Sequence, residues 1–223
     1  MSDESGRLIE RAELIEQARL LNVSLGDAEA QRLVLLLDEL ERWNAAYNLT
    51  SIRGREAMIT HHLLDSLSIH EYLKGARIAD VGTGAGFPGL PLAVANPERQ
   101  FTLIDSAGKK VRFVAHAARA LGLGNVQAVH TRAEDMRPAE PFDTITARAF
   151  AGLPDLLESV YSLSRPGTRV LAMKGRQPRA EIAAVRAPWQ VIEAIPLEVP
   201  RLGAVRHVVI AECVGREGAG GVS

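Results

Sequence analysis

The sequence contains a single cysteine and almost no net charge. Because Cys213 stands alone among 223 residues, neither an intrachain disulfide nor a metal site built on several cysteines is possible. The formal net charge is −1 at pH 7, so a surface for nucleic acid would have to be a local cluster of basic residues. The chain is long enough for one α/β core and a smaller extension.

Long apolar runs and a leader pattern are absent as well. The longest apolar run, Leu33–Leu37, is much shorter than the roughly 20 residues that cross a bilayer. Residues 1–5 show no basic region leading into an apolar run, so no secretory signal is expected. Together with the single cysteine, these features predict a cytoplasmic protein that does not enter a membrane.

Hydrophobic periodicity divides the chain into a helical part and an alternating part. Helical spacing covers 7–22, 27–46 and roughly 55–73, and Asp27 is expected to cap the second helix. Strand-like apolar runs follow at 77–81, 101–104, 126–129, 142–147, 168–173, 189–195 and 207–211. Further helical stretches occur at 89–95, 108–122, 152–163 and 178–187. Strands that alternate with helices predict a parallel sheet covered on both faces.

The last two strands have no helix between them. The connection from residue 195 to residue 207 contains two prolines and a glycine but no helical pattern, so these strands should form an antiparallel hairpin. A boundary is expected near residue 74. The prediction is an N-terminal helical extension at 1–74, a seven-stranded sheet domain at 75–214 and a disordered tail at 215–223.

The most informative segment is IADVGTGAGFPG at 78–89, in which an apolar strand leads into Asp80 and a glycine-rich loop. The spacing G-x-G-x-G at 82–86 begins where the strand ends, as in loops that bind S-adenosylmethionine. The spacing G-x-G-x-x-G at 84–89 fits the dinucleotide fingerprint but begins two residues too late. The carboxylate of Asp80 would also suit a cationic ligand that carries an amino acid better than a pyrophosphate.

A second acid ends the next strand. Asp105 follows the apolar run 101–104, and a carboxylate at this place can accept hydrogen bonds from both ribose hydroxyls of a nucleoside. Either cofactor contains that ribose. The terminal hairpin favours the methyltransferase form of the fold, and a glycine-rich turn without a ligand is the structural alternative.

These motifs together resemble the bacterial ribosomal RNA small-subunit methyltransferase G family, also called the glucose-inhibited division protein B family. The similarity spans roughly residues 30–212 and rests on WNxxYNLT at 43–50, HxxDS at 62–66, DVGTGAGFPG at 80–89, DSxxKK at 105–110, RAF at 148–150, KG at 174–175 and RH at 206–207. It implies a Rossmann-like S-adenosylmethionine-dependent methyltransferase fold of class α/β. It also implies methyl transfer to N7 of a guanine in 16S ribosomal RNA.

Carried over to this chain, the resemblance implies a cofactor site for S-adenosylmethionine at the ends of four strands. Its members are Gly82, Thr83, Gly84, Gly86 and Phe87 in the glycine loop, Asp105 and Ser106 on the ribose side, Ala133 and Glu134 after the third strand, and Arg148 after the fourth. The implied partner is 16S ribosomal RNA or the small ribosomal subunit, and a monomer is expected. No metal is expected, because His61, His62 and Asp65 have no further ligand near them in sequence.

Three residues are catalytic candidates, although none is assigned. Arg148, at the end of the fourth strand, can clamp a carboxylate or phosphate with its guanidinium fork, or form a structural ion pair. Lys174 has the equivalent place on the fifth strand and can meet an RNA phosphate, or be the solvated lysine of a turn. Asn48 can recognise a base or hold the turn after the second helix, and the turn is the favoured role.

Other residues also have both a functional and a structural interpretation. Phe87 can wall the adenosine pocket or pack between loop and helix. Glu134 can meet the adenine amine or belong to a solvated loop. His62 and Asp65 are expected to pack against the sheet domain.

Basic residues form three local groups despite the near-neutral total. They are Arg53 and Arg55; Lys109, Lys110, Arg112, His116 and Arg119; and Arg176, Arg179, Arg201 and Arg206. If these groups converge at the carboxyl edge of the sheet, they would bind RNA phosphates, and otherwise they are scattered solvated charges.

The implied chemistry needs no general base, because guanine N7 carries a lone pair and no proton. The absence of an obvious acid–base pair therefore agrees with methyl transfer to N7. The main contribution of the enzyme would be to position the two reactants. Two other functions stay open at this point: an NAD(P)-dependent oxidoreductase and a non-catalytic RNA-binding module.

Overall fold

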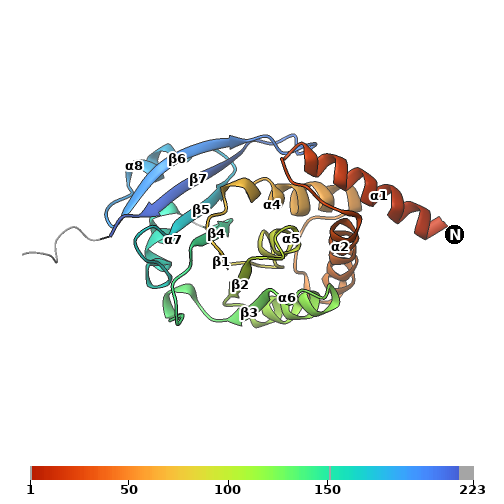
Figure 1. Ribbon diagram of the computed structural model, residues 1–223, viewed down its shortest axis with the longest axis horizontal. Helices are drawn as coiled ribbons and strands as arrows, with labels where there is room; N and C mark the ends of the chain where they lie inside the picture. Colours follow the sequence, from red (N-terminus) through yellow and green to blue (C-terminus); the bar gives the residue numbers. More distant parts are fainter. Residues whose placement is uncertain (1, 151, 216–223) are drawn as a thin grey trace, which may run out of the picture.

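The computed structural model describes residues 2–150 and 152–215 and contains one seven-stranded sheet in the order β3-β2-β1-β4-β5-β7-β6 (Figure 1). The strands are β1 (Arg77–Val81), β2 (Gln100–Asp105), β3 (Val126–His130), β4 (Thr144–Arg148), β5 (Arg169–Lys174), β6 (Trp189–Leu197) and β7 (Arg206–Cys213). Strands β1 to β5 are parallel, and β7 runs antiparallel to both β5 and β6. The predicted sheet and its terminal hairpin are confirmed.

Helices connect the strands and cover both faces of the sheet. The longer ones are α1 (Ser2–Arg19), α2 (Asp27–Tyr47), α5 (Gly89–Ala95), α6 (Gly108–Ala120) and α7 (Leu153–Ser159). The short elements are α3 (Arg55–Met58), the π-helix η1 (Ile59–Leu64), α4 (Asp65–Leu67), α8 (Arg179–Ala183) and the 3-10 turns η2 (His70–Tyr72), η3 (Ala133–Asp135) and η4 (Tyr161–Leu163). Figure 1 shows α1, α2 and α4 on the same side of the sheet as α5 and α6, with α7 on the other side.

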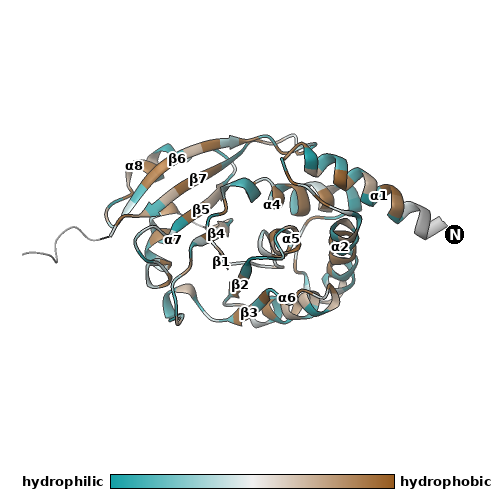
Figure 2. Ribbon diagram, viewed as in Figure 1, coloured by the Kyte–Doolittle hydropathy of each residue, from teal (hydrophilic) through white to brown (hydrophobic). Residues whose placement is uncertain are grey.

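The side chains of β1 point alternately into two hydrophobic clusters, one on each face of the sheet. Ile78 belongs to the cluster formed with α1, α2, α5 and α6, whereas Ala79 and Val81 belong to the cluster formed with α7 and η4. Side chains of a strand point to opposite faces in turn, so this is the expected pattern of a sheet buried on both sides. Residues from 14 to 73 share the first cluster with β1 and β2, and α1 carries apolar and polar bands along its length (Figure 2).

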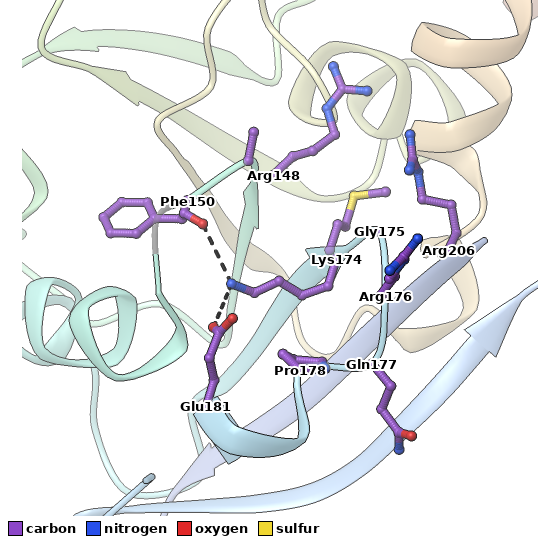
Figure 3. A pocket seen from close by; sticks show the side chains of 11 residues that line it. Arg148, Phe150, Lys174, Gly175, Arg176, Gln177, Pro178, Glu181 and Arg206 are labelled. Carbon is purple, nitrogen blue, oxygen red and sulfur yellow. Dashed lines mark hydrogen bonds and ion pairs between the residues drawn. The ribbon is translucent and has the colours of Figure 1, made fainter. Parts of the chain in front are cut away.

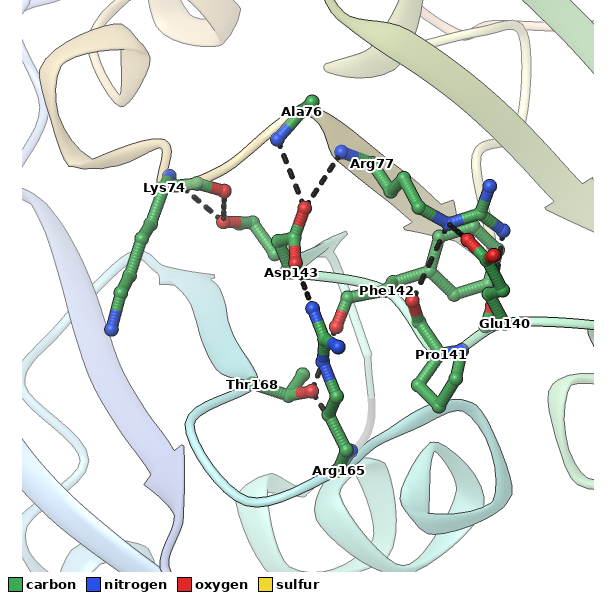
Figure 4. A network of polar contacts seen from close by, with 10 residues as sticks. Lys74, Ala76, Arg77, Glu140, Pro141, Phe142, Asp143, Arg165 and Thr168 are labelled. Carbon is green, nitrogen blue, oxygen red and sulfur yellow. Dashed lines mark hydrogen bonds and ion pairs between the residues drawn. The ribbon is translucent and has the colours of Figure 1, made fainter.

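The junction between the helical extension and the sheet is fixed by Asp143, just before β4 (Figure 4). Its Oδ2 accepts hydrogen bonds from the backbone N–H groups of Ala76 and Arg77 at 2.9 and 3.0 Å, and its Oδ1 accepts one from Arg165 at 2.7 Å. Burial raises the pKa of Asp143, but these bonds and the charge of Arg165 outweigh it, so the pKa lies below its ordinary value. Asp143 thereby ties the start of β1 to the loop before β5.

Two details of the helical part differ from expectation. The stretch 55–73 is not a regular α-helix: α3, the π-helix η1 and α4 follow one another without a gap over 55–67, and the 3-10 turn η2 comes after them. A π-helix occurs mostly as a single turn inside an α-helix, which is too short to be recognised from the apolar pattern. The cap of α2 is Gly26 rather than Asp27, and its N–H donates to Glu29 Oε2 at 3.1 Å. Residues 216–223 of the predicted tail lie outside the described residues.

Candidate functional site

Asp80 anchors the glycine loop from below. Its carboxylate accepts hydrogen bonds from the Thr83 hydroxyl, from the Gly89 N–H at 2.9 Å and from the Thr146 hydroxyl at 3.0 Å. Asp80 is fully buried, and this burial raises its pKa to about 6 although the hydrogen bonds act in the opposite direction. By residue type Asp80 would suit a cationic ligand, but in the structure the protein encloses its carboxylate, which shapes the loop.

Two glycines of this loop have different physical roles. Gly86 has a φ of +87°, and a Cβ there would lie 2.3 Å from Leu90 Cδ1, so it is required by packing. Gly82 has a φ of +67°, and a Cβ there would meet nothing within 4 Å. This open space belongs to a cavity that Gly82 lines.

A cavity of about 320 Å³ lies above the carboxyl ends of β1 and β2. The structure brings five of the predicted cofactor residues into its wall: Gly82, Asp105, Ser106, Ala133 and Glu134. Lys110, Thr131 and Phe150 also line it. The volume lies at the lower end of the range for small-molecule pockets, and the carboxyl ends of parallel strands are where such sheets bind ligands.

Asp105 is the polar centre of this cavity. Its Oδ2 accepts a hydrogen bond from the Gly84 N–H at 2.9 Å, and its Oδ1 accepts one from the Ala107 N–H at 2.8 Å. Lys110 Nζ also forms an ion pair with Oδ2 at 3.7 Å. A carboxylate has about four acceptor positions, so the two backbone bonds leave two for a pair of ribose hydroxyls. Gly84 therefore contributes through its backbone, and the residues present fit a nucleoside.

Thr83, Phe87 and Arg148 do not line the cavity. Thr83 is buried beneath the loop, where it donates to Asp80. The Phe87 ring stacks on the His62 ring at 4.5 Å between centroids, and the Arg148 guanidinium lies 5.6 Å from its centre. The structure shows the packing role of Phe87, because its ring stacks on His62 of the helical extension.

Arg148 is tied to the buried carboxylate of Asp65. Arg148 Nη1 lies 3.1 Å from Asp65 Oδ2, and Arg206 Nε lies 2.8 Å from Asp65 Oδ1. Arg148 also donates to the His61 carbonyl at 2.8 Å. The structural ion pair that the sequence offered as an alternative for Arg148 is thus present, and the expected packing of His62 and Asp65 against the sheet is confirmed.

His62 gives this packing a pH dependence. Burial, followed by the charges of Arg148 and His61, lowers the pKa of His62 from 6.5 to about 3. Between pH 6.5 and about pH 3 the His62 side chain is protonated in the unfolded chain but not in the folded protein. The free energy of unfolding that depends on His62 therefore falls as the pH drops below 6.5. Asp80 acts in the opposite sense, because its raised pKa lets the folded protein take up a proton below about pH 6.

Comparison with His62→Gln isolates the histidine, because the contribution of Asp80 is common to both proteins. Glutamine keeps a hydrogen-bonding group for Thr50, whose hydroxyl lies 3.0 Å from His62 Nε2, but it does not titrate. We expect the stability advantage of the wild type over His62→Gln to shrink by about 2 kcal/mol from pH 7 to pH 5. Urea denaturation at several pH values measures this, and parallel curves would contradict it.

A second cavity, of about 480 Å³, adjoins the first at Phe150 and lies above the ends of β4 and β5 (Figure 3). Arg148, Lys174, Arg176 and Arg206 line it, and Glu181 is the one acidic residue among the described residues of its wall. Ala149 at its edge has a φ of +59°, a strained conformation for a residue with a side chain. Phe150 and Glu181 were not predicted as site residues. Phe150 belongs to the RAF motif, whereas Glu181 had no signal in the sequence.

Lys174 and Asn48 differ in their relation to this cavity. Lys174 Nζ lies 2.9 Å from Glu181 Oε2 and 3.5 Å from the Phe150 carbonyl oxygen, so the lysine is paired inside the cavity rather than solvated. Asn48 is exposed at the end of α2 with a φ of +49°, and its N–H donates to the Asn44 carbonyl. The turn role favoured for Asn48 is the one observed.

The basic groups converge only in part. Arg55 pairs with Glu10 and Asp38, Arg201 with Glu13, and His116 with Glu39, all away from the two cavities. Lys110, Arg176 and Arg206 do reach the cavities. In residues 2–150 and 152–215 no group of three or more metal-binding side chains is found. Within the same ranges, no helix combines the length and apolar character needed to cross a bilayer.

Residues 29–209 match the family model described as "GidB: rRNA small subunit methyltransferase G". The chain belongs to this family. It is 48% identical over 190 residues to the ribosomal RNA small subunit methyltransferase G of Nitrosococcus oceani, covering 85% of this chain and 89% of that protein. The enzyme of the same name from Stenotrophomonas maltophilia (strain K279a) is 46% identical over 198 residues, covering 89% and 93%.

Among solved structures, the O-methyltransferase TomG from Streptomyces achromogenes, in complex with SAM, matches with a TM-score of 0.55 at 16% identity. The match covers 86% of this chain and 92% of that one. At this identity it establishes the fold alone, which is that of S-adenosylmethionine-dependent methyltransferases. Family membership and fold agree with the cofactor predicted from the glycine loop.

Gly82→Ala tests whether the cavity beside the loop holds that cofactor. The new methyl group would occupy the open space beside Gly82, and we expect the affinity for S-adenosylmethionine to fall about 10-fold. Gly122→Ala is a matched control, because Gly122 also has a φ of +67° and open space but lies in the turn after α6. Both variants should lose about 1 kcal/mol of stability. Calorimetry that shows equal affinities for the two variants would remove Gly82 from the site.

Proposed function

We propose that this protein transfers the methyl group of S-adenosylmethionine to N7 of a guanine in 16S ribosomal RNA. The observation that carries the proposal is the pair of adjoining cavities in a chain of the methyltransferase G family. The first has the carboxylate and open glycine that suit an adenosine, and the second is lined by cations that suit an RNA nucleotide. When bound, S-adenosylmethionine supplies a methyl carbon that guanine N7 attacks with its lone pair as the C–S bond breaks, leaving a thioether and a cationic guanine.

The residues of the chain act by positioning. Asp105, held by the Gly84 and Ala107 N–H groups, orients the nucleoside, and Phe150 lines both cavities where the reactants would meet. Arg148 and Arg206, fixed by Asp65, present positive charge to the phosphates of the target strand. No residue has to remove a proton from N7. The target base must leave its stack or already lie in an open loop to reach the cavity.

The experiment is a methylation assay with labelled methyl donor. Small ribosomal subunits and bare 16S ribosomal RNA, both from a strain lacking this protein, are incubated separately with the pure enzyme. Nucleoside mass spectrometry should then show 7-methylguanosine in at least one of them. A methyl group on another base, or none on either substrate, would contradict the proposal, and binding of NADH in place of S-adenosylmethionine would favour an oxidoreductase.

We further propose that residues 1–74 are a helical extension of the methyltransferase domain at 75–214, since both contribute to one hydrophobic cluster. The enzyme would act in the cytoplasm, where ribosomal RNA is its substrate. We also propose that the protein acts as a monomer.

A further inference from the structure

Among the described residues that line the second cavity, Glu181 carries the one carboxylate, beside four cationic side chains. It lies on the short helix α8, and Figure 3 shows its side chain directed toward Lys174. Its Oε2 accepts hydrogen bonds from Lys174 Nζ at 2.9 Å and from the Leu153 N–H at 2.6 Å. Both bonds use the same oxygen. No donor in the described part of the chain contacts the other oxygen, Oε1.

This carboxylate is ionised at neutral pH. Burial raises the pKa of Glu181, but the bonds from Lys174 and Leu153 and the charge of Lys174 outweigh it, so the pKa lies below its ordinary value. The two bonds also fix the side chain, which keeps Oε1 in place as an acceptor. The cavity therefore offers one oriented anionic acceptor among cations.

Guanine is the base whose Watson–Crick edge such an acceptor selects. Its N1–H and its exocyclic N2 amine are adjacent donors, whereas adenine and cytosine present an unprotonated ring nitrogen there and uracil presents one donor, N3–H, between two carbonyl oxygens. The arginine and lysine side chains of the cavity are donors only and cannot accept these protons. We propose that Glu181 Oε1 accepts hydrogen bonds from the N1–H and N2 amine of the target guanine and so determines base specificity. This inference rests on the proposed function.

The same contact would assist the reaction. Methylation at N7 transfers one positive charge to the guanine ring, and N1–H becomes a stronger donor as that charge develops. A fixed carboxylate on this edge stabilises the developing charge more than the neutral ground state, which is the property that accelerates a step. The cations around the cavity then face the phosphates, while Glu181 faces the base.

The test compares guanosine with inosine at the methylated position, once that position has been mapped. Inosine has the same N7 and N1–H but lacks the N2 amine. Substrates are made by ligating a synthetic RNA segment that contains either nucleoside. We expect wild type to prefer guanosine about 10-fold in kcat/KM, as a hydrogen bond to a charged acceptor would give, and Glu181→Gln to reduce the preference to about 2-fold or less.

Glu181→Gln keeps an amide oxygen for Lys174 and the Leu153 N–H, so the local fold has a substitute bond. Unfolding curves and the affinity for S-adenosylmethionine should stay near wild type. Glu193→Gln, on an exposed position of β6, is the matched control and should keep the wild-type preference. A variant at Glu181 that loses rate equally on both substrates would assign the residue to structure and overturn the inference. A wild type that methylates neither substrate at N7 would instead overturn the proposed function.

Discussion

Asp65→Ala should lower the free energy of unfolding by about 3 kcal/mol. Asp65 is fully buried, and its two oxygens bind the guanidinium groups of Arg148 and Arg206, whose side chains are about three-quarters buried. Removing the carboxylate leaves two partly buried positive charges facing each other without their counter-ion. Urea denaturation at neutral pH measures the loss.

The same variant should lose methylation activity even where it is folded. Arg148 and Arg206 line the second cavity, and Asp65 is the group that holds both of them there. With it gone, the two guanidinium groups repel each other and leave their places. Activity measured well below the unfolding midpoint, at saturating S-adenosylmethionine, separates this effect from global stability.

A triple variant provides the control for this prediction. Asp65→Leu combined with Arg148→Met and Arg206→Met replaces the charged cluster with apolar side chains of similar size. Stability should recover most of the lost free energy, because replacing a buried charged cluster as a whole is often neutral or favourable. Activity should stay low. If Asp65→Ala alone cost less than about 1 kcal/mol, the cluster would be too well solvated to support this account.

The sequence predicts the sheet well because its signal is local. Strand-like runs alternate with helical spacing, and the segment 195–207 has no room for a helix, so both the parallel part and the hairpin follow from the pattern. The π-helical turn within the stretch 55–73 could not be predicted in this way. His62 of η1 lies against Phe87, and Asp65 of α4 pairs with Arg148, so both contacts join residues that are distant in sequence.

The two acidic strand ends show where sequence reasoning about the site reaches its limit. Asp80 and Asp105 both lie at the carboxyl end of a strand beside the glycine loop, and either one suits a ligand by type. The fold gives Asp80 three donors and no access to a cavity, whereas Asp105 receives two backbone donors and stays at a cavity wall. The path of the loop backbone decides which carboxylate oxygens are already hydrogen-bonded within the protein. That path cannot be derived from the spacing of residues in the sequence.

Asp105→Ala should weaken the binding of S-adenosylmethionine by at least about 100-fold, the change that a loss of about 3 kcal/mol gives. The loss combines two hydrogen bonds from ribose hydroxyls to a charged acceptor, each worth roughly 1.5–3 kcal/mol, with the release of the Gly84 and Ala107 N–H groups that shape the cavity. Isothermal calorimetry measures the affinity. Asp135→Ala is the control, because Asp135 is an exposed acid of η3 close to the cavity in sequence but outside its wall, and it should bind normally.

A ligand analogue separates the ribose contact from the loop. S-adenosylhomocysteine and its 2′-deoxyribose form differ by one hydroxyl, so wild type should bind the deoxy form about 10-fold more weakly. If Asp105 accepts a hydrogen bond from that hydroxyl, the affinity difference between the two ligands should nearly vanish in Asp105→Ala. The alanine side chain has no oxygen with which the hydroxyl could form the bond. A variant that binds both compounds weakly but keeps the 10-fold difference would show that Asp105 acts only on the loop, and the ribose would then need another partner in the cavity.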